Sequence, residues 1–175
     1  MSSVAFTLRP ESMLDDEAIE RLHERAFGPG RYARTAFRLR EGHGPETASQ
    51  PSRFSFSAHV GTFLVGSVRL SPITAGAEPA LMLGPLTVDP SFEGVGIGAA
   101  LMRRALGAAQ EAGETLVLLV GDEPYYRRFG FAVIPEGQLV LPGPVNPKRF
   151  LGVELADGAL ERARGPVRAR QGNQP

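Results

Sequence analysis

The chain has 175 residues, of which 42% are hydrophobic and 22% are charged, and its 19 basic and 19 acidic residues cancel to a net charge of zero. This size and composition indicate one soluble globular domain, and a neutral chain lacks the positive field that supplies most nucleic-acid affinity. The absence of cysteine excludes disulfides, thiolate metal sites and a cysteine nucleophile. We therefore expect no nucleic-acid partner and no metal.

The N-terminal sequence contains no basic segment followed by an apolar one, as a secretion signal would. The longest aliphatic run, residues 116–120, is far too short to cross a bilayer. These two features predict a cytoplasmic protein with no membrane partner.

The first half of the sequence predicts one strand, two helices and then a three-stranded antiparallel meander. Ser12 and Asp15 resemble a capping box that opens the first helix, and Gly-Pro-Gly at residues 28–30 ends that helix. An arginine-rich helix is expected over residues 32–39, followed by a polar surface loop over residues 41–53. Apolar patterns predict strands over residues 4–8, 54–60, 63–70 and 81–88.

The second half predicts a long helix, a buried strand and several short closing elements. Ile97, Leu101 and Ala105 share one face of a helix that Gly113 ends. The aliphatic run over residues 115–120 is typical of a central strand buried on both faces. A short helix is expected over residues 122–129, with closing strands over residues 131–133, 139–141 and 150–155.

This order of elements predicts a mixed α/β (α+β) fold in a single domain over residues 1–164. The central sheet is expected to be mostly antiparallel, with about six or seven strands flanked by about four helices. Residues 165–175 are expected to form a frayed C-terminal tail.

The segment most informative about function is residues 86–101, a glycine-rich stretch between a predicted strand and a predicted helix. Glycines let a ligand approach the backbone, and N–H groups at a helix start attract negative charge. A tight turn with close helix packing would use the same glycines, so the surrounding sequence has to decide between the two interpretations.

Two nucleotide-binding patterns fit this segment poorly. Gly94, Gly96 and Ala99 satisfy the dinucleotide pattern G-x-G-x-x-A, but residues 89–93 separate the strand from the first glycine. Too few residues then follow for the second half of a doubly wound sheet. A P-loop is disfavoured because no Lys-Ser or Lys-Thr follows the glycines.

The sequence L-T-V-D-P followed by E-G-V-G-I-G-A-A-L resembles the acetyl-CoA signature of the GNAT superfamily, written Q/R-x-x-G-x-G/A. Residues 125–131, Y-Y-R-R-F-G-F, resemble the second hallmark of that family, a short helix with a tyrosine, three residues and Gly-Phe. The order of elements over residues 4–155 is similar to the family's fold. The resemblance implies a GNAT-like acyl-CoA acyltransferase fold. It also implies an N-acetyltransferase that transfers an acetyl group from its cosubstrate acetyl-CoA to a primary amine by direct attack.

The resemblance further implies which residues hold acetyl-CoA. The backbone of Leu86, Thr87 and Val88 is expected to hydrogen-bond the pantetheine arm, and the Val88 N–H to donate to the developing oxyanion. Glu93 departs from the family pattern, in which Gln or Arg is usual, and a carboxylate there repels a diphosphate. We therefore expect slightly weaker cofactor binding. The residues expected to wrap the pyrophosphate are Gly94, Val95, Gly96, Ile97, Gly98 and Ala99.

Tyr126 matches the general acid of the family, because it lies four residues before Gly130. A phenol with a pKa of about 10 is protonated at neutral pH, as an acid must be. The neighbouring Tyr125 is expected to be structural.

The sequence identifies neither the general base nor the particular acceptor. The expected acceptor class is a small-molecule or peptide amine. The strand over residues 81–88 contains no Glu to relay a proton. Isolated histidines and a row of arginines on a helix are more often structural or solvated than functional. The candidates left unassigned are His43, Glu46 and His59 for the base, and Arg31, Arg34 and Arg38 for an acidic acceptor.

Two other classes of function are considered beside the acetyltransferase. A non-catalytic acyl-CoA-binding sensor would have no use for a phenol near the sulfur. A nucleotide-dependent oxidoreductase would need a larger substrate-binding portion than this chain has. The sequence leaves a homodimer open.

Overall fold

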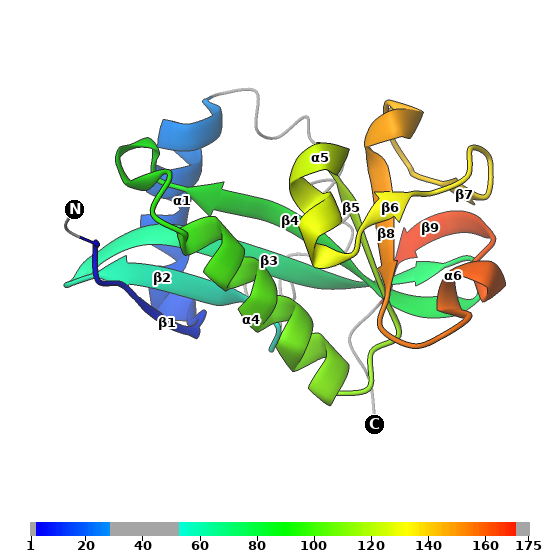
Figure 1. Cartoon of the computed structure of the whole chain (residues 1–175), viewed down its shortest axis with the longest axis horizontal. Coiled ribbons are helices and arrows are strands. Elements are labelled where there is room, and N and C mark those ends of the chain that lie inside the picture. The colour runs from blue at the N-terminus through cyan, green and yellow to red at the C-terminus, as the bar shows by residue number, and fades with distance from the viewer. Residues whose placement is uncertain (1–2, 29–52, 171–175) are drawn as a thin grey trace.

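The computed structural model describes residues 3–28 and 53–170 (Figure 1). The helix expected over residues 32–39 lies outside the described residues. The same holds for five of the unassigned candidates, namely Arg31, Arg34, Arg38, His43 and Glu46.

The centre of the molecule is one mixed sheet with the strand order β1-β2-β3-β4-β5-β8-β6. Strands β1 to β4 pair antiparallel in chain order, β4 pairs in parallel with β5, and β5 pairs antiparallel with β8. The bounds of the main strands are β1 (Thr7–Pro10), β2 (Phe56–Val60), β3 (Phe63–Ala75), β4 (Glu78–Val88), β5 (Leu116–Val120) and β8 (Phe150–Glu154). The short strands are β6 (Ala132–Val133), β7 (Leu139–Val140) and β9 (Gly165–Ala169).

The helices begin where the sequence supplies caps. Ser12 forms a capping box with Asp15, as expected, and the 3-10 turn η1 (Met13–Asp15) leads into α1 (Asp16–Phe27). The other helices are α4 (Ile97–Glu111), α5 (Glu123–Tyr126) and α6 (Ala159–Arg162), with 3-10 turns η3 (Pro90–Phe92), η4 (Arg127–Phe129) and η5 (Pro147–Arg149).

Helices α4 and α1 cover opposite faces of the sheet, with α4 in front of the strands and α1 behind them in Figure 1. The contact with α4 is close, because a Cβ added at Gly66 of β3 would meet Ile97 at 2.9 Å and Leu101 at 3.1 Å. Leu101, Met102 and Ala105 of α4 are fully buried, as are Ile19 and Leu22 of α1. Removing these side chains from water is the main favourable term that fixes the helices on the sheet.

A second buried cluster lies on the face of β4 and β5 away from α4 and contains Ile73 of β3, Leu118 of β5 and Val167 of β9. Here the sequence prediction of a frayed tail from residue 165 is wrong for residues 165–169. These residues form β9, which pairs with residues 73–75 of β3 and with β7. The physical reason is that the β3–β4 hairpin extends farther than its sequence suggests, and β9 covers the edge that this extension creates.

The predicted mixed α/β class with a mostly antiparallel sheet is confirmed. The sheet has nine strands within the described residues, more than the six or seven expected. β6 and β7 fall within the closing strands expected over residues 131–133 and 139–141, whereas β9 lies in the segment expected to be a frayed tail.

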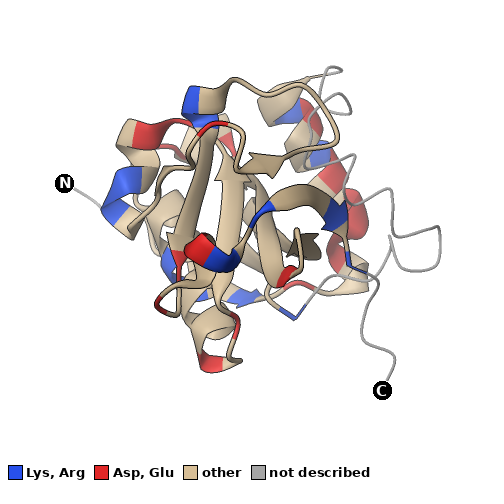
Figure 2. Cartoon of the chain, turned by 90° about the vertical axis from the view of Figure 1, so that its right-hand side faces the viewer, with Lys and Arg blue, Asp and Glu red and all other residues tan. Residues whose placement is uncertain are grey.

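Charged residues of both signs are spread over the helices and connecting segments (Figure 2). None of the described helices combines the length and the apolar character needed to cross a membrane.

Candidate active site

The end of β4 has one edge without a neighbouring strand. The described pairing between β4 and β5 ends at Met82 and Leu118. The Asp89 N–H donates to the carbonyl of Val65 in β3 at 2.8 Å. Because N–H groups alternate in direction along a strand, those of Leu86 and Val88 point away from β3, toward the side where β5 has diverged. They are therefore available to a ligand lying along β4.

The start of α4 presents a second set of backbone donors. Gly96 is the N-cap residue with φ 92°, and no side chain caps the helix. The first bond within the helix runs from the Ala100 N–H to the Gly96 carbonyl, at 3.0 Å. The N–H groups of Ile97, Gly98 and Ala99 precede that bond and have no partner inside the helix. Together with the positive end of the helix dipole they favour an anion.

Two glycines of this segment adopt a backbone conformation that favours glycine, and both border open space. Gly94 and Gly96 have φ values of 80° and 92°, a region that other residues rarely adopt. A Cβ added at either one would meet nothing within 4 Å. The glycines therefore border open space, into which a phosphate could fit without displacing protein atoms.

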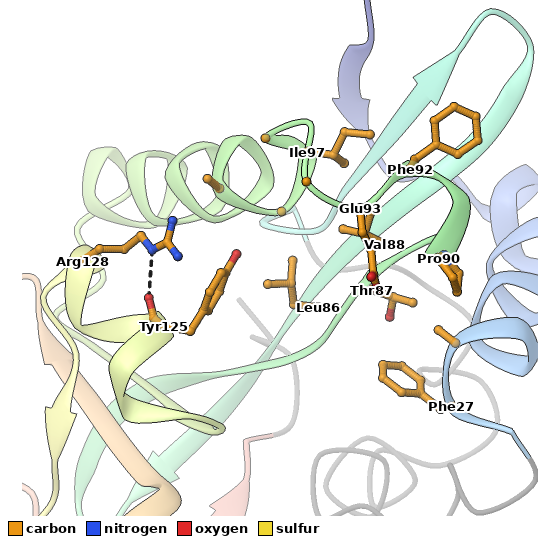
Figure 3. Close-up of a pocket in the computed structure, with 15 residues that line it drawn as sticks. Phe27, Leu86, Thr87, Val88, Pro90, Phe92, Glu93, Ile97, Tyr125 and Arg128 are labelled. Carbon is orange, nitrogen blue, oxygen red and sulfur yellow. Dashed lines mark hydrogen bonds between the residues drawn. The ribbon is translucent and has the colours of Figure 1, made fainter. Parts of the chain in front are cut away.

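A cavity of about 580 Å³ joins the free edge of β4 to the start of α4. Figure 3 shows Leu86 and Val88 on one part of its wall, with Tyr125 and Arg128 reaching toward it from the other side. Phe27, at the end of α1, lies on the wall beside Thr87. This volume is within the usual range for a small-molecule or cofactor site.

Most of the residues that the sequence analysis assigned to acetyl-CoA are together in this cavity. Val95 is the exception: it is not part of the wall, and its side chain is exposed. The assigned residues that line the cavity are Leu86, Thr87, Val88, Gly94, Gly96, Ile97, Gly98 and Ala99.

The two adjacent tyrosines have different surroundings. A Cβ added at Gly98 would lie 2.9 Å from the Tyr125 hydroxyl, which places that hydroxyl beside the start of α4. Tyr126 does not line the cavity, and its ring contacts Gly121, just after β5, and packs edge-on to Phe131. Tyr125 is thus at the helix end of the site, beside the start of α4, whereas Tyr126 lies beside Gly121 and outside the cavity wall.

The sequence analysis missed several residues of the cavity wall. Tyr125 was expected to be only structural, and Arg128 was not considered at all, although it lies within the second hallmark. Phe27 comes from the end of α1, so no local motif connects it with the glycines. Only the arginine beside a tyrosine offered a signal that could have been found.

His59 is placed away from this cavity, on the α1 face of β2. Its Nε2 accepts a hydrogen bond from Arg9 Nε at 3.1 Å and lies 3.0 Å from the Ser57 hydroxyl. Burial and, to a smaller extent, the Arg9 charge hold the pKa of His59 below its usual value, against an opposing effect of Asp15. His59 is therefore a buried neutral histidine that is not positioned as a base for this site.

Among the residues that the structure describes, the cavity wall contains no histidine and a single carboxylate, that of Glu93. Among the described residues, no group of three or more His, Asp or Glu side chains could hold a metal ion. The groups that the described wall offers are backbone N–H groups, the Tyr125 phenol, the Arg128 guanidinium and the Glu93 carboxylate.

Comparisons with known proteins connect this geometry to a family. Residues 16–131 match the model of the acetyltransferase (GNAT) family. The chain is 32% identical over 106 residues to YhbS of Escherichia coli strain K12, which is described as an uncharacterized N-acetyltransferase. This alignment covers 59% of the chain and 64% of YhbS, less than two thirds of that relative.

Two solved structures share the fold over most of the chain. The crystal structure of E. coli YhbS in complex with CoA has a TM-score of 0.79 and 26% identity, covering 97% of this chain and 92% of that chain. A GNAT family acetyltransferase from Brucella melitensis, in complex with acetyl-CoA, has a TM-score of 0.63 and 28% identity, with coverages of 85% and 95%. The resemblance and the fold predicted from the two motifs are thereby confirmed.

Proposed function

Because the chain belongs to the GNAT family of acetyltransferases, we propose that it transfers an acetyl group from acetyl-CoA to a primary amine of a small molecule or peptide by direct attack. The observation that carries this proposal is the single cavity that joins the free edge of β4 to the start of α4. One ligand with a peptide-like arm and a diphosphate would use both sets of backbone donors at once.

Different residues of the cavity wall would bind different parts of acetyl-CoA. The N–H group of Leu86 would bond an amide oxygen of the pantetheine arm, while those of Ile97, Gly98 and Ala99 would bind the pyrophosphate. Holding the arm against a fixed strand orients the thioester for attack, which is worth more to the rate than affinity alone.

For the reaction itself, we assign the Val88 N–H as the donor to the oxyanion and Tyr126 as the general acid. The N–H of Val88 points into the gap between β4 and β5, where charge develops on the thioester oxygen. Tyr126 packs beside Gly121, just after β5, and we infer from its place in the second hallmark that its phenol would protonate the departing CoA thiolate. Tyr125, at the helix end, would contact the cofactor without giving it a proton.

The function is tested by binding and by turnover. Acetyl-CoA should raise the melting temperature, NAD should not, and a screen of amine classes should reveal CoA release with at least one acceptor. The screen should include polyamines, amino acids, aminoglycosides and peptide N-termini. Stabilisation by NAD that equals or exceeds that by acetyl-CoA would favour the oxidoreductase. Binding of acetyl-CoA without turnover of any amine would favour the sensor.

The assignment of Tyr126 predicts the largest kinetic effect of any substitution at the site. Tyr126→Phe keeps the ring but removes the proton, so kcat should fall by roughly 10²- to 10⁴-fold with little change in acetyl-CoA affinity. Tyr125→Phe is the matched control and should change kcat far less. Single-turnover kinetics with the responsive acceptor measure the chemical step directly. A folded Tyr126→Phe enzyme with wild-type kcat for that step would remove Tyr126 from the mechanism.

A further inference from the structure

Two adjacent arginines in η4 differ in their partners. Arg127 makes a two-point ion pair with Glu123 of α5, with N–O distances of 2.7 and 2.6 Å. Arg128 has no carboxylate partner among the described residues. Its guanidinium lies 4.5 Å from the centre of the Tyr125 ring, and its Nε donates to the Tyr125 carbonyl at 3.1 Å. The stacking and the hydrogen bond fix the direction of the side chain.

Arg128 lines the cavity and Arg127 does not. In Figure 3 the Arg128 guanidinium and the Tyr125 ring lie side by side on the wall that approaches the start of α4. The terminal nitrogens of Arg128 make no hydrogen bond to any residue that the structure describes. An oriented arginine with free donors is well suited to a phosphate, because its planar fork can bind two oxygens of one group.

Glu93 makes this cation more significant. It also lines the cavity, at the turn before Gly94, and it occupies the position where the signature has Gln or Arg. A carboxylate at that position adds negative charge to a site shaped for an anion, and it weakens the binding of a diphosphate. A positive charge from another part of the chain would offset this effect. Arg128 is the only cationic side chain of the cavity wall within the described residues.

We propose that Arg128 binds a phosphate group of CoA. This arginine of the second hallmark would thereby supply the positive charge that Glu93, at the Gln/Arg position of the first motif, does not provide. Tyr125 holds the guanidinium in place through its ring and its carbonyl. This inference rests on the proposed function, because it names a further residue of the same cofactor site.

The test measures the affinity of CoA by calorimetry for the full chain and four variants. Arg128→Gln should weaken CoA binding by roughly 5- to 30-fold, the effect of one charge-assisted contact at a partly hydrated site. The matched control, Arg127→Gln, removes the same charge one residue away and should change affinity by less than about 2-fold. Glu93→Gln should tighten binding. Arg128→Lys, which keeps the charge but loses the fork, should lie between wild type and Arg128→Gln.

Ligands with fewer phosphates identify the source of the effect. If Arg128 binds the 3′-phosphate, Arg128→Gln should weaken CoA but leave 3′-dephospho-CoA unchanged. If it binds the diphosphate, both ligands should weaken. Acetyl-pantetheine, which has no phosphate, should bind wild type and Arg128→Gln equally. An equal loss with acetyl-pantetheine would show that the arginine only supports packing, and the inference would be overturned.

The inference and the proposed function fail in different ways. If wild type binds no CoA, the proposed function is wrong. If wild type binds CoA and Arg128→Gln matches Arg127→Gln, only the role of Arg128 is wrong. Melting temperatures of the ligand-free variants show whether each one is folded, and exposed arginines such as these two should be replaceable without loss of the fold.

Discussion

The two faces of the sheet are built from alternate residues of the same strands, yet they differ in chemistry. The face under α4 is apolar and tightly packed, with Phe56, Ala58, Gly66, Val68, Leu86 and Val88. The face under α1 carries a row of polar residues that lie directly opposite one another on β1 to β4, namely Arg9, Ser57, Ser67 and Thr87. The strands therefore have one apolar and one polar face, and β4 lines the cavity from both, through Leu86 and Val88 on one face and Thr87 on the other.

The polar row is only partly satisfied. Ser57 lies within hydrogen-bond distance of His59, whereas the hydroxyls of Ser67 and Thr87 are fully buried and have no partner among the described residues. A buried hydroxyl without a partner costs free energy that an apolar residue of the same size would not. The comparison teaches that the face under α4 is close to its packing limit, whereas the face under α1 is not at its stability optimum.

The packing of the α4 face can be broken by one added methyl group. Gly66→Ala would place a Cβ 2.9 Å from Ile97, 3.1 Å from Leu101 and 3.3 Å from Ala58. These neighbours are fully buried, so we expect a loss of about 1–3 kcal/mol in the free energy of unfolding, measured with urea. Acetyl-CoA affinity should fall too, because Ile97 opens α4. If both quantities stay at wild-type values, the face is looser than described.

The polar face should respond in the opposite direction. Ser67→Ala removes a hydroxyl without a partner, so the free energy of unfolding should stay the same or rise by up to about 1 kcal/mol. Ser57→Ala removes a hydroxyl that bonds His59 and should cost about 1 kcal/mol. Urea denaturation of the pair sharpens the comparison. An equal loss in both variants would mean that Ser67 has a partner, such as a buried water, and the contrast between the faces would be smaller.

The smallest expected effect is a pH dependence from His59. Its pKa is lowered in the folded state, so the unfolded chain binds more protons between that lowered pKa and the ordinary value of about 6.5. Stability should therefore decrease as the pH falls below about 6.5 and level off below the folded-state pKa. In His59→Gln this decrease should be shallower over the same range. Parallel pH profiles for the two proteins would show that His59 does not contribute.

The sequence was most informative for those elements that a single short segment determines by itself. The capping box at Ser12, the glycines before α4 and the aliphatic run of β5 each determine their element within a few residues, and all three are confirmed. The element order and two motifs were enough to identify the family. The roles of Val88 and Tyr126 remain predictions, because no ligand tests them.

The sequence could not predict features that depend on contacts between segments distant in the chain. Phe27 of α1 and Arg128 of η4 line one cavity, and no local motif connects Phe27 with the glycines. Tyr125 and Tyr126 have the same side chain and adjacent positions, so only the direction of each ring distinguishes them. β9 was missed because its single buried apolar residue, Val167, stands among arginines and a proline.

The pairing of β9 with β3 has a consequence for how the chain folds. Ile73 pairs with Ala169, and all of β4, α4, β5 and β8 lie between them in the sequence. Contacts between such distant segments require the closure of a long loop, which makes them slow to form. We therefore expect the meander and α4, which hold the cavity, to assemble first and the second cluster to close last. Changes in β9 would then alter the folding rate and amide exchange at the far end of the sheet, and leave acetyl-CoA affinity as it is.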